Sequence, residues 1–170
     1  QVTLSLSGLI GSETLNSTNN STFNNKNVGT NKPVTVNSIT LANGTNGGLA
    51  SNYSISPDLT TTATIIAKPL IVSGITVSNK TYDNNSNATL DVSLISYDGL
   101  IPGDNFTGSY TGSFINENVA SGKQVNISSI YSGSDVINYN ITNQMTSFAN
   151  INKGNPTISG LTDQERNFRD

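Results

Sequence analysis

The residues best suited to chemistry in this chain include three oxygen-bearing side chains in one short stretch. Asp83, Asn85 and Asn87 alternate along the sequence, with the spacing that calcium loops use for their first ligands. Such a loop needs a bidentate glutamate further on, and Leu94 stands at that position. A turn stabilised by asparagine side chains has the same spacing. We therefore predict a structural turn without a metal, and keep these three residues as the candidate ligands.

A second possible chemistry is a covalent bond between a lysine and an asparagine side chain, which some cysteine-free surface modules form. Lys32 and Lys123 occupy equivalent positions in two similar stretches of the sequence, and so do Asn52 and Asn138. An exposed lysine that discourages pairing between strand edges would explain the same equivalence. We favour this second explanation. A mass deficit of ammonia in each module would support the covalent bond.

Asparagine is also the acceptor of N-linked glycans, and many of the asparagines here stand in N-x-S/T sequons. The chain is so rich in asparagine, serine and threonine that composition accounts for most of these sequons. The eleven candidate glycosylation sites are Asn16, Asn19, Asn20, Asn43, Asn52, Asn79, Asn84, Asn87, Asn105, Asn126 and Asn140.

Catalysis is not expected. Hydrolysis of a glycosidic bond would need two carboxylates flanking a cleft, for which Asp98 with Asp104, or Glu117 with Asp135, are the available pairs. The first pair lies on either side of a Pro-Gly turn, which is typical of a loop. The sequence contains no histidine and no cysteine, which excludes imidazole and thiolate chemistry. We predict a protein that is not an enzyme, with no catalytic residues and no cofactor.

Composition and patterning predict an all-β chain with a polar surface. Only 34% of the residues are hydrophobic and 11% are charged, and asparagine, serine, threonine and glycine all favour helices poorly. Val2, Leu4 and Leu6 alternate with polar residues, as do Val34 and Val36 and, in the second copy, Val125 and Ile127. The stretch 106–114 alternates aromatic or glycine residues with serine and threonine. We predict small β-sandwich modules of the immunoglobulin-like kind, with a β-grasp-like arrangement as the alternative.

Charge and hydropathy limit the possible partners. The net charge is −3 and the eight basic residues form no stripe, so nucleic-acid binding is not expected. No apolar stretch approaches the roughly 18 residues that a membrane span requires, so insertion of this segment into a membrane is not expected either. We expect a monomer. Gln1 stands inside an alternating pattern, without a signal peptide before it, which suggests a fragment of a longer protein.

The chain contains an internal repeat. Residues 8–39 align without a gap on residues 99–130, and further on SNYSI at Ser51 corresponds to INYNI at Ile137. Fewer residues separate the equivalent positions in this second alignment than in the first, because the first copy has extra residues in its Gly/Asn-rich stretch 43–50. A length difference confined to a loop, with patterned flanks on both sides, indicates two copies of one folded module.

The boundary between the copies has two solutions, because residues 70–83 have a weaker echo in residues 157–170. In one, residues 1–68 are a first repeat without its leading strand, 69–153 a complete second repeat, and 154–170 the start of a third. In the other, 1–83 and 84–170 are two complete modules. Lys68-Pro69 favours the first solution, because proline interrupts central strands and is common in linkers.

Four motifs together resemble the YDG/MBG repeats, which occur in tandem in large filamentous-haemagglutinin-like bacterial surface adhesins. They are NKTYDNNSNATL at Asn79, PGDNF at Pro102, FINENVASGKQV at Phe114 and INYNI at Ile137. The resemblance covers nearly all of the second copy and most of the first.

The sequence departs from the repeat pattern at three points. Asn84 replaces the glycine of Y-D-G, Ala120 replaces the glycine that the first copy keeps as Gly29, and Gly11-Ser12-Glu13 replaces Gly-Asp. Alanine at position 120 predicts an ordinary negative φ there, since a left-handed alanine would be strained.

The resemblance implies a secreted protein of the bacterial cell surface that acts in cell adhesion. The segment would be a non-enzymatic stalk or spacer that presents a distal binding region. The alternative is that the modules themselves bind glycan or host extracellular matrix. Partners would then be a host-cell glycan or a matrix protein, contacted through the parent protein.

Overall fold

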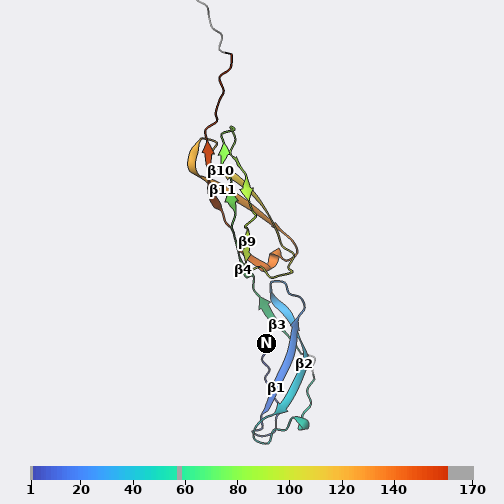
Figure 1. Ribbon diagram of the computed structural model, residues 1–170. Helices are drawn as coiled ribbons and strands as arrows, with labels where there is room; N and C mark the ends of the chain where they lie inside the picture. Colours follow the sequence, from blue (N-terminus) through green and yellow to red (C-terminus); the bar gives the residue numbers. More distant parts are fainter. Residues whose placement is uncertain (1, 57–58, 161–170) are drawn as a thin grey trace, which may run out of the picture. The chain divides into compact units, whose positions relative to one another are not determined.

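The computed structural model describes residues 2–56 and 59–160, which form two compact units (Figure 1). The first unit comprises Gln1–Lys68 with Asp135–Asn140, and the second comprises Pro69–Ser134 with Ile141–Asp170. The described residues hold strands and two short 3-10 turns, Ala50–Asn52 and Val136–Asn138, but no α-helix. The prediction of an all-β chain is therefore confirmed. A β-grasp-like arrangement would need a helix packed on the sheet, and the described residues provide none.

The first unit contains one antiparallel sheet of three strands in the order β1-β2-β3. Alternation in the sequence predicted its central strand, where Val34 and Val36 point into the core and the intervening residues face water. The strands are β1 (Leu15–Phe23), β2 (Gly29–Asn43) and β3 (Leu59–Ile65).

The second unit holds more strands, most of them short. They are β4 (Lys68–Ser73), β5 (Thr76–Val77), β6 (Lys80–Thr81), β7 (Asn87–Ala88), β8 (Leu90–Asp91), β9 (Ser96–Asp98), β10 (Thr107–Phe114), β11 (Ala120–Ser132), β12 (Tyr139–Thr142) and β13 (Thr146–Asn152). The sheet orders are β6-β13-β11-β10-β7, β12-β4-β9 and β5-β8. The predicted strand at 106–114 is β10.

The core of the second unit lies between the five-stranded sheet and the short β5-β8 pair. Its fully buried members share one face of the large sheet, and Val77 of β5 packs against them from the other side. This gives a two-layer arrangement, in which apolar side chains of both layers leave water. The buried members are Phe114, Val125, Ala149 and Ile151.

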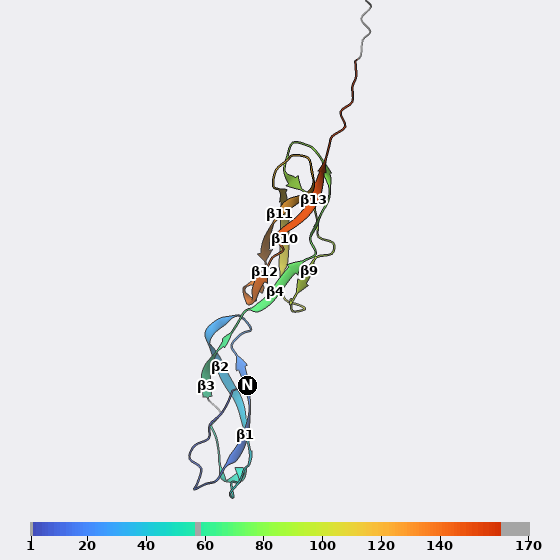
Figure 2. The ribbon, with the colours of Figure 1, turned by 90° about the vertical axis from the view of Figure 1, so that its left-hand side faces the viewer.

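Strand β4 is the central strand of the three-stranded sheet β12-β4-β9 (Figure 2). Leu70 and Val72 alternate toward the interior and are among the most buried residues of the protein. Lys68 and Pro69, which were expected to form a linker, are the first two residues of β4, and this strand is hydrogen-bonded to β9 with Val72 opposite Tyr97. The boundary between the two compact units falls between Lys68 and Pro69. Of the expected third-repeat segment 154–170, residues 161–170 lie outside the described residues.

The expected strand at Val2–Leu6 is wrong, because residues 2–10 form no strand. The second copy explains why. There, the equivalent residues 96–98 are β9, which is a strand only because β4 lies beside it. No strand equivalent to β4 lies beside residues 5–7 in the described first copy, so their backbone groups have no ladder to join.

Candidate functional site

A buried lysine closes the loop between β1 and β2 of the first copy. Lys32 Nζ donates to Asn25 Oδ1 at 2.6 Å, and the Asn27 backbone N–H donates to the same oxygen at 3.0 Å. The side chain of Asn25 thus folds the loop as an Asx turn, and the hydrogen bond from the buried ammonium group of Lys32 holds the Asn25 side chain in place.

The second copy repeats this loop between β10 and β11. The Asn118 backbone N–H donates to Asn116 Oδ1 at 3.1 Å, and Lys123 Nζ donates to Asn116 Oδ1 and to the Asn118 carbonyl. Lys123 is only 6% exposed. The motif F-x-N-x-N-V-x-x-x-K therefore encodes a loop whose oxygens hold a lysine that belongs to the following strand.

A bulge places each lysine in the interior. The pairing register shifts between Gly29 and Lys32 in the first copy and between Ala120 and Lys123 in the second. The residue just before each lysine is left-handed, with φ 52° at Asn31 and 58° at Gly122. Asparagine and glycine tolerate this conformation better than other residues. Ala120 does not have a positive φ, as expected from the sequence.

The structure pairs the two lysines differently from the sequence-based nomination. Lys32 contacts Asn25 and not Asn52, and Lys123 contacts Asn116 and not Asn138. The amide of Asn138 instead donates to Asp135 Oδ1 at 3.4 Å. Offset alone places residues in equivalent positions, without saying which loops meet. The expectation of exposed lysines is also wrong, since both are buried.

We expect Lys123→Met to lower the free energy of unfolding of the second unit by about 1–3 kcal/mol, because it removes hydrogen bonds from a charged donor. Methionine keeps most of the apolar stem, so the loss reports on the ammonium group. Lys32→Met should act likewise on the first unit. Hydrogen exchange resolved by segment measures both, and the exposed Lys153 gives the control Lys153→Met. Equal effects of all three substitutions would contradict a role for the loop contacts.

A third lysine, Lys80, is surrounded by oxygen atoms in the stretch that was considered as a calcium loop, and we call this arrangement the lysine cage. Lys80 Nζ lies 2.6 Å from Asp83 Oδ1, 3.0 Å from Asn85 Oδ1, and 2.9 and 3.1 Å from the carbonyls of Asn85 and Asn87. The ammonium ion thus stands where a metal would, with four oxygen neighbours. Its position above the Phe114 ring, 5.9 Å from the centroid, adds a cation–π contact.

The three candidate ligands therefore serve the loop itself. The Asn85 N–H donates to Asp83 Oδ1 at 3.3 Å, and the Asn87 N–H donates to Asn85 Oδ1 at 3.0 Å. These are the Asx contacts of a structural turn. Among the described residues, no group of three or more acidic side chains could hold a metal ion. Sequence reasoning missed the lysine, although Lys80 stands only three residues before Asp83.

The lysine cage makes stability depend on acid pH. The hydrogen bond from Lys80 holds the pKa of Asp83 below its usual value. The native state therefore gains stability from this carboxylate above the unfolded pKa of about 3.9, and loses it as pH falls through the lower native pKa. We expect Asp83→Asn to destabilise the protein at about pH 7, with the difference shrinking as pH falls below the unfolded pKa. Thermal unfolding across this window measures it. A difference independent of pH would contradict the cage.

An aromatic cluster lies on the face of β10 that carries its glycines. Tyr110 Oη donates to Tyr97 Oη at 3.0 Å. Burial, and to a lesser degree this hydrogen bond, raises the pKa of Tyr110. Phe106 packs edge-on against Tyr97 at 5.4 Å between ring centroids, and contacts Tyr131 at 5.3 Å. The rings pack against one another, and this leaves less ring surface for stacking on a sugar.

Glycine makes this arrangement possible. A Cβ at Gly108 would meet Tyr110 Oη at 2.2 Å, and one at Gly112 would meet Leu90 Cδ2 at 2.6 Å. Glycine at position 108 lets the Tyr110 side chain lie along the strand, and glycine at position 112 leaves room for Leu90.

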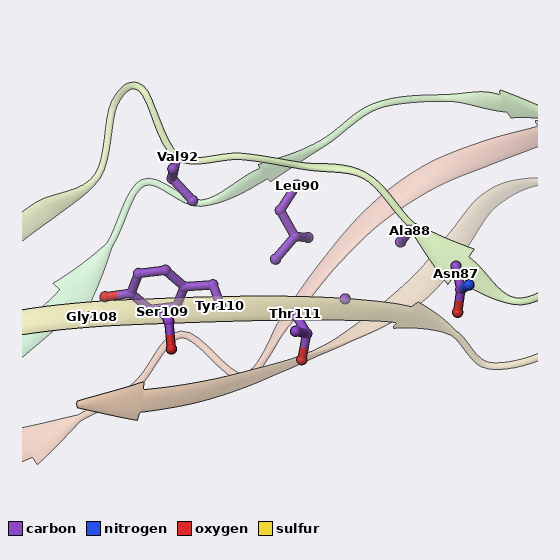
Figure 3. Close-up of a pocket in the computed structure, with 9 residues that line it drawn as sticks. Asn87, Ala88, Leu90, Val92, Gly108, Ser109, Tyr110 and Thr111 are labelled. Carbon is purple, nitrogen blue, oxygen red and sulfur yellow. The ribbon is translucent and has the colours of Figure 1, made fainter. Parts of the chain in front are cut away.

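A hollow of about 540 Å³ runs beside this face (Figure 3). Leu90 and Val92 point toward β10 from the facing segment, while Ser109 and Thr111 point to the other side of the strand. The hollow arises because β7 pairs with β10 only at Gly112 and Ser113, after which the chain leaves to pair with β5. Its lining is uncharged and mixed in polarity. Ala88, Leu90 and Val92 are apolar, and the polar residues are Asn87, Ser109, Tyr110 and Thr111.

The residues considered for catalysis lie in different elements of the structure. Asp98 lies on β9 opposite Ile71, and Asp135 forms an ion pair with Lys26 at 2.7 Å in the first unit. Asp104 closes a turn through its N–H, which donates to the Ile101 carbonyl at 3.1 Å.

The sequon asparagines lie mostly at the surface. All are exposed except Asn19, which is half-buried. The side-chain nitrogen of Asn19 donates to the Val2 carbonyl at 2.7 Å, and that of Asn16 donates to the Asn43 carbonyl at 2.9 Å. A glycan is attached through this nitrogen, so these two sites are engaged in the fold.

The comparisons with known proteins give one family. The model of the YDG domain matches residues 1–63 and again residues 66–147, one match for each copy. Comparisons with curated proteins and with solved structures gave no significant match. In the described residues, no helix has the length and apolar character of a membrane span. Two successive domain matches cover most of the sequence, and the chain therefore belongs to the YDG domain family.

Proposed function

We propose that this chain is a non-enzymatic spacer segment of a secreted bacterial surface adhesin of the filamentous-haemagglutinin-like kind. The observation that supports it most is the use of reactive side chains inside the fold. Lys32, Lys80 and Lys123 each hold a loop together, and both copies repeat the same loop. The duplication thus preserves a shape, which suits a module that transmits load and sets distance.

The second unit also has a contact suited to bearing tension. β6 pairs in parallel with the last strand, β13, with Lys80 opposite Ile151. The Asn150 N–H donates to Asn79 Oδ1 at 2.7 Å, and the Tyr82 N–H donates to the Asn152 carbonyl at 2.9 Å. These bonds join the first third of the unit to its final strand.

Parallel pairing matters because of the direction of pull. A load applied through the two ends of the unit draws β6 and β13 in opposite directions along their common axis. The bonds between them are then loaded together in shear and must fail together. Antiparallel strands pulled from one end would instead open one bond at a time.

Single-molecule stretching of the full chain tests the spacer role. We expect a distinct unfolding event for the second unit, at a force that Asn79→Ala lowers. Asn155→Ala, in the exposed segment after β13, is the matched control and should leave the force unchanged. Extension without a resolved event, or equal effects of the two substitutions, would contradict a load-bearing role.

The second candidate function is direct binding of a host-cell glycan or matrix protein by the modules. The hollow beside β10, with Tyr110 on its floor, is the observation that favours it. A glycan array and matrix-protein binding by the isolated chain test it. Saturable binding that Tyr110→Ala abolishes would support this function and replace the pure spacer.

A further inference from the structure

We propose that the hairpin tip formed by residues 26–28 is a recognition site for the turn 135–138, and that the charge at residue 26 decides which turn a tip accepts. The turn lies in the second sequence copy, but Asp135–Asn140 belongs to the first compact unit. A tip with glutamate in place of Lys26 should then fit a turn that begins with lysine or arginine. The proposal concerns recognition of a turn by a loop and does not depend on the spacer role.

One part of the contact between tip and turn is made by uncharged groups. The Val28 backbone N–H donates to Asn138 Oδ1 at 2.9 Å, and Asn138 Nδ2 donates to Asn27 Oδ1 at 3.3 Å. A single asparagine amide thus uses its acceptor and its donor on adjacent residues of the tip. The turn that presents this amide is closed by the Asn138 N–H, which donates to the Asp135 carbonyl at 3.0 Å.

The other part of the contact is an ion pair, in which Lys26 Nζ lies 2.7 Å from Asp135 Oδ1. The side chain of Asp135 is only 9% exposed, whereas that of Lys26 is 61% exposed. A carboxylate that is removed from water in this way is costly unless it is paired and hydrogen-bonded. The ammonium group of Lys26 therefore offsets the burial of the Asp135 charge, and a negative side chain at position 26 would add to its cost.

The tip is held in shape by its own loop. Asn25 Oδ1 accepts from the Asn27 N–H at 3.0 Å and from Lys32 Nζ at 2.6 Å. These bonds fix the backbone on which Asn27 and Val28 present their polar groups to the turn. A loop that is already ordered loses less conformational freedom when it binds. The buried lysine of the loop therefore contributes to recognition as well as to stability.

The tip of the second copy keeps the uncharged residues and reverses the charge. It comprises residues 117–119, whose last two positions are asparagine and valine as in the first tip. Its first residue is Glu117, which stands where the first tip has Lys26. Glutamate beside an aspartate would place two like charges together, which disfavours a contact. We therefore expect a tip of this second kind to reject an aspartate turn and to fit a basic one.

The turn of the first copy shows the same division between a constant and a variable part. Residues 50–52 form a 3-10 turn, as residues 136–138 do, and both turns end in asparagine. Leu49 stands where the second copy has Asp135, so the first turn has the amide without the charge. Turn shape and amide are common to both copies, and the charge is the property by which a tip can distinguish one turn from another.

An exchange of charges in the full chain tests the proposal. Lys26→Glu gives the first tip the residues of the second, and Asp135→Lys gives the turn that such a tip should fit. Exchange of the Val28 amide hydrogen, measured by NMR, reports on the contact because this N–H is bonded to Asn138. We expect each single change to speed this exchange by about tenfold or more. The double variant, with opposite charges restored, should return to within about threefold of the original rate.

Two controls separate recognition from a general effect of charge. Lys153→Glu makes the same change at an exposed lysine of the second unit and should leave the exchange of Val28 unchanged. Asn138→Ala removes the amide and should speed the exchange whichever charges stand at positions 26 and 135. Single charge changes without effect on Val28, or a double variant that exchanges as fast as the faster single variant, would overturn the proposal.

A second pair of substitutions keeps the size of the buried carboxylate, in case Asp135→Lys prevents folding. Lys26→Met removes the positive charge, and Asp135→Asn removes the negative one. Because the two charges act on each other, the double variant should speed the exchange of Val28 no more than the more damaging single variant does. If the effects of the two single changes multiplied, the charges would act independently and selection by charge would be refuted.

Discussion

Leu70→Ala is expected to lower the free energy of unfolding of the second unit by about 2–5 kcal/mol. Leu70 is 0% exposed, and truncating it leaves a cavity between β4 and the layers around it. The loss should fall on the second unit because β4 pairs with β9. Faster hydrogen exchange in β10 and β11, with unchanged exchange in β1 and β2, would locate it there.

The neighbouring residue provides a matched control. Ile71 points away from the interior on the same strand and is 48% exposed, so Ile71→Ala should cost about 1 kcal/mol or less. Both substitutions lower the β propensity of the same strand, and their difference therefore isolates burial. If Leu70→Ala were to destabilise the first unit instead, β4 would belong to the module that precedes it.

Alternation predicted the long strands because their own residues carry the information. Val34 and Val36 in β2, Val125 and Ile127 in β11, and the glycine–aromatic face of β10 all follow a period of two with one buried face. The resemblance to the YDG family rested on four short motifs, and the two-copy organisation on the alignment of residues 8–39 with 99–130.

The candidate sites were harder to predict, since they depend on which loops meet. The oxygens at Asp83, Asn85 and Asn87 had the spacing of metal ligands, yet Lys80 supplies the cation. Sequence spacing records the positions of the oxygens along the chain and not the charge that approaches them. A lysine three residues before the motif was the available signal.

The failed strand at Val2–Leu6 has a different cause. Its alternation is as regular as that of β2, but a strand also needs a neighbour with which to exchange hydrogen bonds. The equivalent β9 has β4 beside it, and residues 2–10 have no such strand among the residues that the structure describes. Local pattern decides which face is buried, and pairing decides whether a strand forms.

The equivalent glycines allow this difference to be measured. We expect Gly99→Ala to destabilise the second unit by about 3 kcal/mol, as the sum of two effects. A left-handed alanine costs about 1–2 kcal/mol, and the clash of its Cβ with the Pro69 carbonyl, at 2.4 Å, adds about 1–3 kcal/mol. Gly8→Ala has the same positive φ but open space around it, so only the first effect applies. Hydrogen exchange in each unit measures both.

The comparison within one chain removes the usual uncertainty about the reference state, since both substitutions have the same chemistry and similar φ. The difference between them reports on β4, which lies against Gly99, whereas no described residue lies within 4 Å of a Cβ at Gly8. If the two losses were equal, β4 would not press on Gly99, and the first unit would lack no strand there.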